Sequence, residues 1–276
     1  MIITVVGLGV VGGSYVKALK GQGYEVYGVD IDEETLQQAK DEGCIIEGYT
    51  DGHEIIAKSD LTVICLYPSL VLDFIASHTF KKGSIVTDVV GIKSYFMKKA
   101  IELIDPDVEY VSGHPMAGRE NKGYAFASKE VFQGANFIII EHQKNKRESI
   151  QFMQDFVSQL GFKSVRIMSP YEHDEIISFT SQLSHVIAVS LMNSDDQKYD
   201  TGKYIGDSFR DLTRIANINP DLWAELFLNN KKYLLSSMER FENQFDILKQ
   251  ALLNDDEEGL KELFYESSSR REKLEK

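Results

Sequence analysis

Short apolar runs alternate with longer amphipathic stretches through the first 170 or so residues of the chain. The runs that we interpret as strands cover residues 2–6, 24–29, 61–66, 84–88, 109–111, 136–140 and 162–168. Helical patterns lie between several of them. Strands that alternate with helices are typical of a parallel sheet covered by helices. The pattern therefore predicts an α/β fold with a doubly wound, mostly parallel sheet.

The pattern changes after Pro170. From Tyr171 onward we find no convincing strand, only long apolar periodicities of helical spacing. A chain of 276 residues is long enough for two modest domains, each with its own core. We therefore predict an α/β domain over residues 1–169 and an all-helical domain over residues 170–276.

A regular heptad stripe marks the helical half of the chain. It runs along a helix that we expect to begin near Pro220, and its members are Leu234, Met238, Phe241, Phe245, Leu248 and Leu252. Such a stripe needs an apolar partner, because helices bury their apolar faces against other elements. The partner is either another part of the same domain or a second copy of the chain. We favour the second interpretation, which predicts a homodimer formed through the helical domain.

A glycine-rich loop follows the first predicted strand. Its residues are Gly7, Leu8, Gly9, Val10, Val11 and Gly12. In a loop of this spacing the first glycine permits a tight turn, the second leaves the backbone bare for a phosphate, and the third lets a helix pack closely. The first amides of that helix then face a pyrophosphate. Glycines also occur in ordinary tight turns, so the strand before the loop and the helix after it carry the prediction of a dinucleotide site.

Asp30 ends the second predicted strand, 18 positions after Gly12. A carboxylate at this place accepts hydrogen bonds from the two ribose hydroxyls of NAD and repels the 2′-phosphate of NADP. Asp32, Glu33 and Glu34 make the neighbourhood more negative still. We therefore predict NAD as the cofactor, the alternative being an ordinary turn with a capping aspartate.

Charge and composition limit the partners of the chain. The formal net charge of −13 argues against nucleic acid and anionic membranes as general partners. Cys44 and Cys65 are too few and too far apart for a disulfide framework or a metal ribbon, and we interpret both as reduced thiols. The sequence has neither a run of about 18 apolar residues nor a signal-peptide pattern. We therefore expect a cytoplasmic protein that binds an anionic substrate only through a local basic cluster.

His114 stands in a stretch rich in glycine and proline that follows the strand predicted at 109–111. This order places it at the carboxyl edge of the sheet, where open α/β folds bind ligands. An imidazole there can take the proton of a substrate hydroxyl while hydride leaves the adjoining carbon. The alternative is a histidine that is only hydrogen-bonded within the turn.

Arg210 and Arg214 form a second candidate cluster. Four residues apart on a predicted helix, they share a face, and one or both can grip a carboxylate with two hydrogen bonds. A simple surface ion pair with Asp211 is the alternative. His173 and His185 lie in the same helical region without the spacing of metal ligands, and we predict no metal.

At these residues the chain resembles the prephenate and arogenate dehydrogenase family, and the likeness extends over nearly its whole length. The matching motifs are the loop from Gly7 to Gly12, Asp88 with Lys93, the block from Gly113 to Glu120, Ser181 to His185, Thr213 to Ala216, and Pro220, Leu222 and Trp223 with Phe227 and Asn229. The resemblance implies a Rossmann-type nucleotide domain followed by a helical dimerisation domain. Related Rossmann dehydrogenases do not combine the histidine block with the arginine motif.

The resemblance also implies a reaction, namely oxidative decarboxylation. NAD accepts hydride from the ring carbon that bears the hydroxyl, His114 takes the hydroxyl proton, and the ring carboxylate leaves as CO2. In the family's pattern Arg214 binds a substrate carboxylate. The other residues that the resemblance assigns are His185, Glu120 and Gln182 to the substrate site, with Glu120 near its entrance, and Asp88 to the cofactor site.

Three departures from the family's usual pattern concern the pocket. Gly91 stands where the family has a serine that bonds near the histidine and the substrate hydroxyl, Gln182 replaces a histidine, and the run 205–208 replaces a glycine run. The expected function is an NAD-dependent prephenate dehydrogenase that makes 4-hydroxyphenylpyruvate for tyrosine synthesis. The alternatives are an arogenate dehydrogenase that gives tyrosine directly, or a non-catalytic NAD-binding regulatory protein, which the presence of His114 and Arg214 disfavours.

Overall fold

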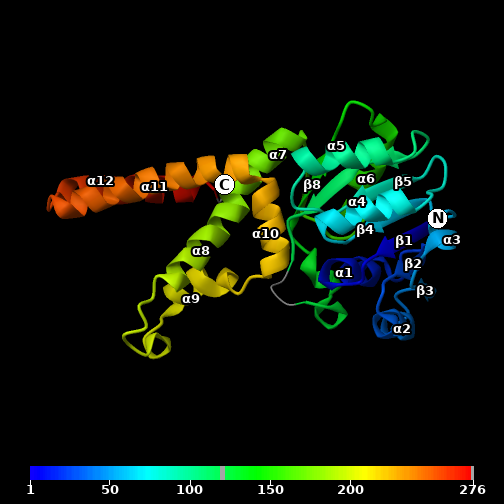
Figure 1. The fold of residues 1–276 in the computed structure, drawn as a ribbon, viewed down its shortest axis with the longest axis horizontal. Helices are drawn as coiled ribbons and strands as arrows, with labels where there is room; N and C mark the ends of the chain where they lie inside the picture. Colours follow the sequence, from blue (N-terminus) through cyan, green and yellow to red (C-terminus); the bar gives the residue numbers. More distant parts are fainter. Residues whose placement is uncertain (119–121, 275–276) are drawn as a thin grey trace.

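In the computed structural model, which describes residues 1–118 and 122–274, an α/β domain is followed by a set of helices (Figure 1). The main sheet has the strand order β3-β2-β1-β4-β5-β6, and every neighbouring pair is parallel. Its strands are β1 (Ile2–Val6), β2 (Glu25–Val29), β3 (Glu47–Tyr49), β4 (Leu61–Ile64), β5 (Ile85–Asp88) and β6 (Glu109–Tyr110). The predicted doubly wound fold is confirmed, although the short strand β3 was not predicted.

Helices cover both faces of this sheet (Figure 1). They are α1 (Val10–Leu19), α2 (Glu33–Asp41), α3 (His53–Ile56), α4 (Pro68–Ser77), α5 (Ser94–Leu103) and α6 (Arg147–Gln159). Neighbouring residues of a central strand point to opposite faces, so Val5 and Val63 belong to one buried cluster, and Val6 and Ile64 to the other. Burial on both faces explains why these strands are continuous apolar runs. The strand order reverses beside β1 and β4, whose carboxyl ends form the crevice where such sheets bind ligands.

A second, three-stranded sheet holds β7 (Ser112–Pro115), β8 (Asn136–Ile140) and β9 (Ser164–Met168). β8 pairs antiparallel with β7 and parallel with β9. The expectation that residues 136–140 join the main parallel sheet is therefore wrong. An apolar run predicts a buried strand but does not encode its pairing partner. The glycine- and proline-rich residues 112–115 were expected to follow a strand. They form a strand of their own, β7, and β7 carries His114.

The remaining helices belong to the C-terminal part of the chain, apart from the short turns η1 (Tyr124–Phe126) and η2 (Lys129–Val131). They are α7 (Pro170–Ile177), the π-helical turn η3 (Ser178–Gln182), α8 (Leu183–Asn193), η4 (Thr201–Lys203), α9 (Asp207–Thr213), η5 (Arg214–Ala216), α10 (Pro220–Asn229), α11 (Lys231–Leu253) and α12 (Glu257–Lys273). No strand occurs between 170 and 274, the last described residue. α11 and α12 form a hairpin that projects from the body of the molecule (Figure 1).

The predicted helix over the heptad stripe begins later than expected. Asn230 separates α10 from α11, with φ of −114° and ψ of 19°, so the stripe lies on a helix that begins at Lys231 and not near Pro220. Leu234 is buried, whereas Phe245 and Leu252 are 61% and 57% exposed. The stripe is therefore buried at Leu234 and becomes largely exposed toward Leu252 within the described part of the chain.

One helical stretch, Pro170–Asn193, is long and apolar enough to cross a membrane by length and composition alone. It contains the buried polar residues His173, Asp174 and Gln182, all of which are hydrogen-bonded within the protein. These contacts attach the stretch to the rest of the protein, and 28% of its most apolar window is buried within the described chain.

Candidate active site

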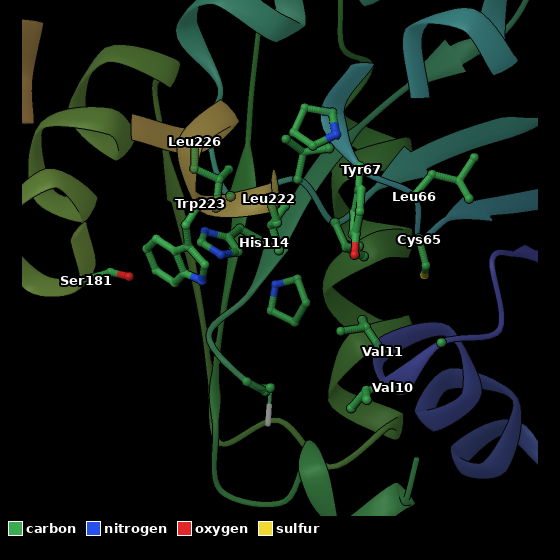
Figure 2. Close-up of a pocket in the computed structure, with 18 of the residues that line it drawn as sticks. Val10, Val11, Cys65, Leu66, Tyr67, His114, Ser181, Leu222, Trp223 and Leu226 are labelled. Carbon is green, nitrogen blue, oxygen red and sulfur yellow. The ribbon is translucent and has the colours of Figure 1, made fainter. Parts of the chain in front are cut away.

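A cavity of about 430 Å³ opens at the carboxyl ends of β1, β4 and β5, where the α/β domain meets the C-terminal helices (Figure 2). Residues from both parts of the chain line it. They are Gly9, Val10, Val11, Cys65, Leu66, Tyr67, Pro68, Val89, Val90, Gly91, His114, Pro115, Ala117, Gly118, Lys122, Gly123, Ile177, Ser181, Gln182, Leu222, Trp223 and Leu226. The sheet crevice and the helices thus enclose one site.

The glycine loop has the geometry expected of a phosphate-binding turn. Gly7 has a φ of +80°, a backbone angle that residues with a Cβ rarely adopt. A Cβ on Gly12 would lie 1.9 Å from the carbonyl oxygen of Gly7, so only glycine fits where α1 packs against the loop. A Cβ on Gly9 would meet no atom within 4 Å. The backbone at Gly9 is therefore open to the cavity that it lines together with Val10 and Val11.

Asp30 lies against this loop. One carboxylate oxygen accepts a hydrogen bond from the amide of Leu8 at 2.6 Å, and the other accepts one from the amide of Asp32 at 3.0 Å. A carboxylate offers about four acceptor sites, so sites remain for further donors. The structure therefore brings together the two features that predicted a dinucleotide site.

His114 is the first member of a line of three side chains. Its Nδ1 lies 2.8 Å from Nε2 of His173, and Nδ1 of His173 lies 2.8 Å from a carboxylate oxygen of Asp174. That oxygen also accepts the amide of Lys93, and the second oxygen accepts the amide of Ser94. Sequence reasoning missed His173 and Asp174, because a separation of 59 residues hides the contact with His114.

The surroundings of His114 favour its neutral form. Burial lowers the pKa of His114 well below its usual range, and the nearby His173 and Lys93 lower the pKa further. A Cβ on Gly91 would lie 3.6 Å from Nε2 of His114, so this nitrogen faces the side of the cavity that Gly91 lines. A neutral imidazole with one nitrogen directed at a cavity has the properties of a general base.

Asp88 and Lys93 form a buried ion pair beneath the cavity, and both side chains are fully buried. The carboxylate of Asp88 accepts hydrogen bonds from Lys93 Nζ, from Tyr110 Oη and from Ser112 Oγ. Lys93 Nζ also donates to the carbonyl oxygen of Gly113, at 2.7 Å. Asp88 therefore lies beneath the cavity, where protein donors occupy its carboxylate and this carboxylate anchors the backbone next to His114.

Gln182 lines the cavity from the π-helical turn η3. Its Oε1 accepts a hydrogen bond from Asn230, and its Nε2 donates to the carbonyl oxygen of Leu226. His185 is half-buried one turn further along, where its Nδ1 lies 2.9 Å from the carbonyl oxygen of Ser181 and its ring stacks on Trp223 with ring centroids 3.7 Å apart. Trp223 itself lines the cavity, so His185 supports its wall from behind.

Arg210 and Arg214 do not share one α-helix. α9 ends at Thr213, and Arg214 begins the 3₁₀ turn η5, so the spacing of four does not act along a continuous helix. Both side chains are exposed in the single chain, and neither is among the described residues that line the cavity. Glu120 lies outside the described residues.

The two halves of the chain each match a family description. Residues 15–166 match "Prephenate dehydrogenase, nucleotide-binding domain", and residues 169–266 match "Prephenate dehydrogenase, dimerization domain". The chain belongs to the prephenate dehydrogenase family. The protein is thus an oxidoreductase of the group that includes prephenate, arogenate and cyclohexadienyl dehydrogenases.

Relatives of this family match along nearly the whole chain. Prephenate dehydrogenase of Bacillus subtilis is 28% identical over 99% of this chain and 76% of its own length, and cyclohexadienyl dehydrogenase of Zymomonas mobilis is 28% identical over 98% and 94%. The solved prephenate dehydrogenase of A. aeolicus, in complex with hydroxyphenyl propionate and NAD+, is 27% identical with a TM-score of 0.89 and covers 99% of this chain and 98% of its own. The arogenate dehydrogenase of Synechocystis, at 23% identity and a TM-score of 0.83, shares the fold.

Proposed function

We propose that the protein is an NAD-dependent prephenate dehydrogenase. It converts prephenate and NAD+ to 4-hydroxyphenylpyruvate, CO2 and NADH, a step toward tyrosine. The observation that carries the proposal is the position of His114. Its Nε2 faces a cavity that also contains the open backbone of Gly9, so a base and a dinucleotide loop meet in one site.

The residues present fit the cofactor. Gly9 and the first turn of α1 would hold the pyrophosphate, and the acceptor sites left on Asp30 would hold the ribose hydroxyls. Bound NAD supplies the acceptor for the hydride that leaves the hydroxyl-bearing ring carbon. His114 Nε2 accepts the proton of that hydroxyl. When the carbonyl has formed and the ring carboxylate leaves as CO2, the electron pair of the broken C–C bond makes the ring aromatic and leaves a phenolate, which takes back the proton, so the protein needs only to position the substrate and to hold one proton.

Arg214 is the proposed ligand of a substrate carboxylate, supported by the family pattern and by the packing of η5 against α8, the helix that carries His185. Arg210, His185, Gln182 and Glu120 complete the proposed substrate site. In this arrangement His185 acts through Trp223, on which it stacks. The guanidinium of Arg214 suits a carboxylate because it can donate two parallel hydrogen bonds.

Prephenate is the proposed substrate in preference to arogenate. The two differ in the side chain, where arogenate has an ammonium group. Among the described residues that line the cavity, Lys122 is the cationic side chain and no carboxylate occurs, while Glu120, the carboxylate assigned to the entrance, lies outside the described residues. A site with this lining favours a dianionic substrate over one that carries an additional positive charge.

We also propose a cytoplasmic homodimer whose interface includes α11, with the domains divided as residues 1–169 and 170–276. The exposed stripe supports this, since Phe241, Phe245 and Leu252 present apolar surface along one helix. Contiguous apolar surface of this kind marks an association site.

One assay tests the proposed reaction. Purified protein is mixed with NAD or NADP and with prephenate or arogenate, and the absorbance of the reduced nicotinamide is followed. We expect turnover with NAD and prephenate, and its loss in His114→Ala. Absence of turnover with either substrate would overturn the proposal, and NAD binding without turnover would indicate a regulatory protein.

A further inference from the structure

The base and the groups that orient it come from different domains. His114 lies on β7 of the α/β domain, whereas His173 and Asp174 lie on α7, the first of the C-terminal helices. His173 and Asp174 are fully buried, and neither lines the cavity among the described residues. They therefore act on a substrate only through His114.

The contacts determine which nitrogen of each ring carries the proton. Burial raises the pKa of Asp174, but hydrogen bonds from His173 and Ser94 together outweigh it and hold the pKa below its usual range, so this carboxylate only accepts hydrogen bonds. Nδ1 of His173 must then be the donor to Asp174. In a neutral imidazole the other nitrogen is an acceptor, so Nε2 of His173 accepts the proton on Nδ1 of His114.

We propose that His173 and Asp174 are positioning residues that hold His114 in the tautomer with the proton on Nδ1, leaving the lone pair of Nε2 directed at the cavity. This inference rests on the proposed role of His114 as the base. A histidine that lacks such an acceptor exchanges between two tautomers, and only one of them has a free Nε2.

The carboxylate of Asp174, the last member of the line, is itself held in place. The amides of Lys93 and Ser94, at the start of the ten-residue helix α5, donate to its two oxygens at 2.8 and 2.7 Å. The side chain of Asn230 donates to the carbonyl oxygen of Asp174. The two amides at the start of α5 thus hold the carboxylate, and with it the ring of His173, in one orientation, while Asn230 fixes the backbone of Asp174.

Two other charged groups, Lys93 and Asp88, lie near the line and are paired with each other. Lys93 Nζ is the cation that faces the two histidines from the α/β domain, and Asp88 neutralises it through a contact of 2.8 Å. Asp174 acts on His173 directly, through the hydrogen bond to its Nδ1, and reaches His114 only through that ring. The arrangement is that of a base oriented by a third group, in which the carboxylate keeps its charge throughout.

Nuclear magnetic resonance of protein labelled with ¹⁵N at histidine tests the tautomer without any substrate. The chain has six histidines, and the His114 signals are assigned by their loss in His114→Gln. We expect a proton on Nδ1 of His114 in the wild-type protein, and a mixture of tautomers or a proton on Nε2 in His173→Leu. A proton on Nε2 in the wild-type protein would overturn the proposal even if the enzyme turns prephenate over.

Kinetics of two variants separate positioning from packing. His173→Leu removes the acceptor, whereas His173→Gln keeps an amide oxygen near the same place. We expect His173→Leu to lower kcat about 10²-fold or more with the KM for NAD unchanged, and His173→Gln to recover a good part of the loss. Equal losses in both variants, or wild-type kcat in His173→Leu, would contradict the proposal. His78→Gln, a substitution at the far end of α4, is the control and should leave kcat unchanged.

Discussion

The carboxylate of Glu225 accepts a hydrogen bond from the backbone amide of Ser69, across 2.8 Å. Glu225 lies on α10, and Ser69 lies in the first turn of α4, where unpaired amides favour a negative charge. A second contact joins the same elements, because Asn219 donates to the hydroxyl of Tyr67 at 2.7 Å. α10 also contributes Trp223 to the cavity. These contacts therefore hold one wall of the cavity against the α/β domain.

Replacing Glu225 should loosen this wall. Glu225→Ala removes the cap on α4, and we expect a loss of about 1 kcal/mol in the free energy of unfolding, the usual effect of removing a cap. The KM for substrate should rise several-fold, whereas kcat should change less. Denaturant unfolding and initial rates measure both effects. Glu102→Ala, an exposed substitution on α5, is the control, and an equal change in that variant would contradict the role of Glu225.

The pH dependence of the reaction should reflect the buried state of His114. The base acts only when it is neutral, and burial lowers its pKa. The value of kcat/KM should therefore fall on acidification, with a midpoint below the ordinary histidine pKa of about 6.5. A pH profile that instead shows this midpoint above 7 would contradict the assignment.

The same burial makes protein stability depend on pH. The folded-state pKa values of His114 and His173 are both lowered, chiefly by burial, so the unfolded chain binds protons that the folded chain excludes. Stability should therefore be full above the unfolded value of about 6.5 and decrease as the pH falls below it. Thermal unfolding from pH 8 to pH 5 measures this, and His114→Gln should reduce the dependence.

Asp30 should determine the choice of cofactor. Asp30→Ala removes the carboxylate that would bind the ribose hydroxyls. We expect the KM for NAD to rise about tenfold or more and the preference for NAD over NADP to decrease. The ratio of kcat/KM for the two cofactors gives the result. Glu33→Gln lowers the local negative charge without touching Leu8, and it is the matched control. An unchanged ratio in Asp30→Ala would remove Asp30 from the cofactor site.

Two glycines near His114 should respond differently to a side chain. A Cβ on Gly91 would meet its nearest atoms at 3.6 Å, an ordinary contact, whereas a Cβ on Gly113 would lie 2.6 Å from the ring of Phe137. We expect Gly91→Ser to fold with wild-type stability and to change the KM for substrate more than the KM for NAD. Gly113→Ala should lose about 1–3 kcal/mol by overpacking. Comparison of the two melting curves tests this, and similar losses in both variants would refute it.

The structure shows which features a sequence pattern can predict. The glycine loop and Asp30 could be predicted because their geometry depends on local turns and on two adjacent strands. The line from His114 to Asp174 could not, because it depends on how two domains pack. The same holds for β8, whose apolar run fits either sheet. Asn230 lies where α10 ends and α11 begins, and its side chain bonds to Asp174 and Gln182, contacts that spacing does not reveal.

The partition of His114 and Asp174 between two domains constrains how this protein can be recombined. A chimaera joined near residue 169 inherits its base from one parent and the orienting carboxylate from the other. The chimaera would be active only if both parents place the histidine of α7, which is His173 here, at the same position against β7. The join between the halves is thus a poor crossover point for gene shuffling, although it separates two regions of different secondary structure.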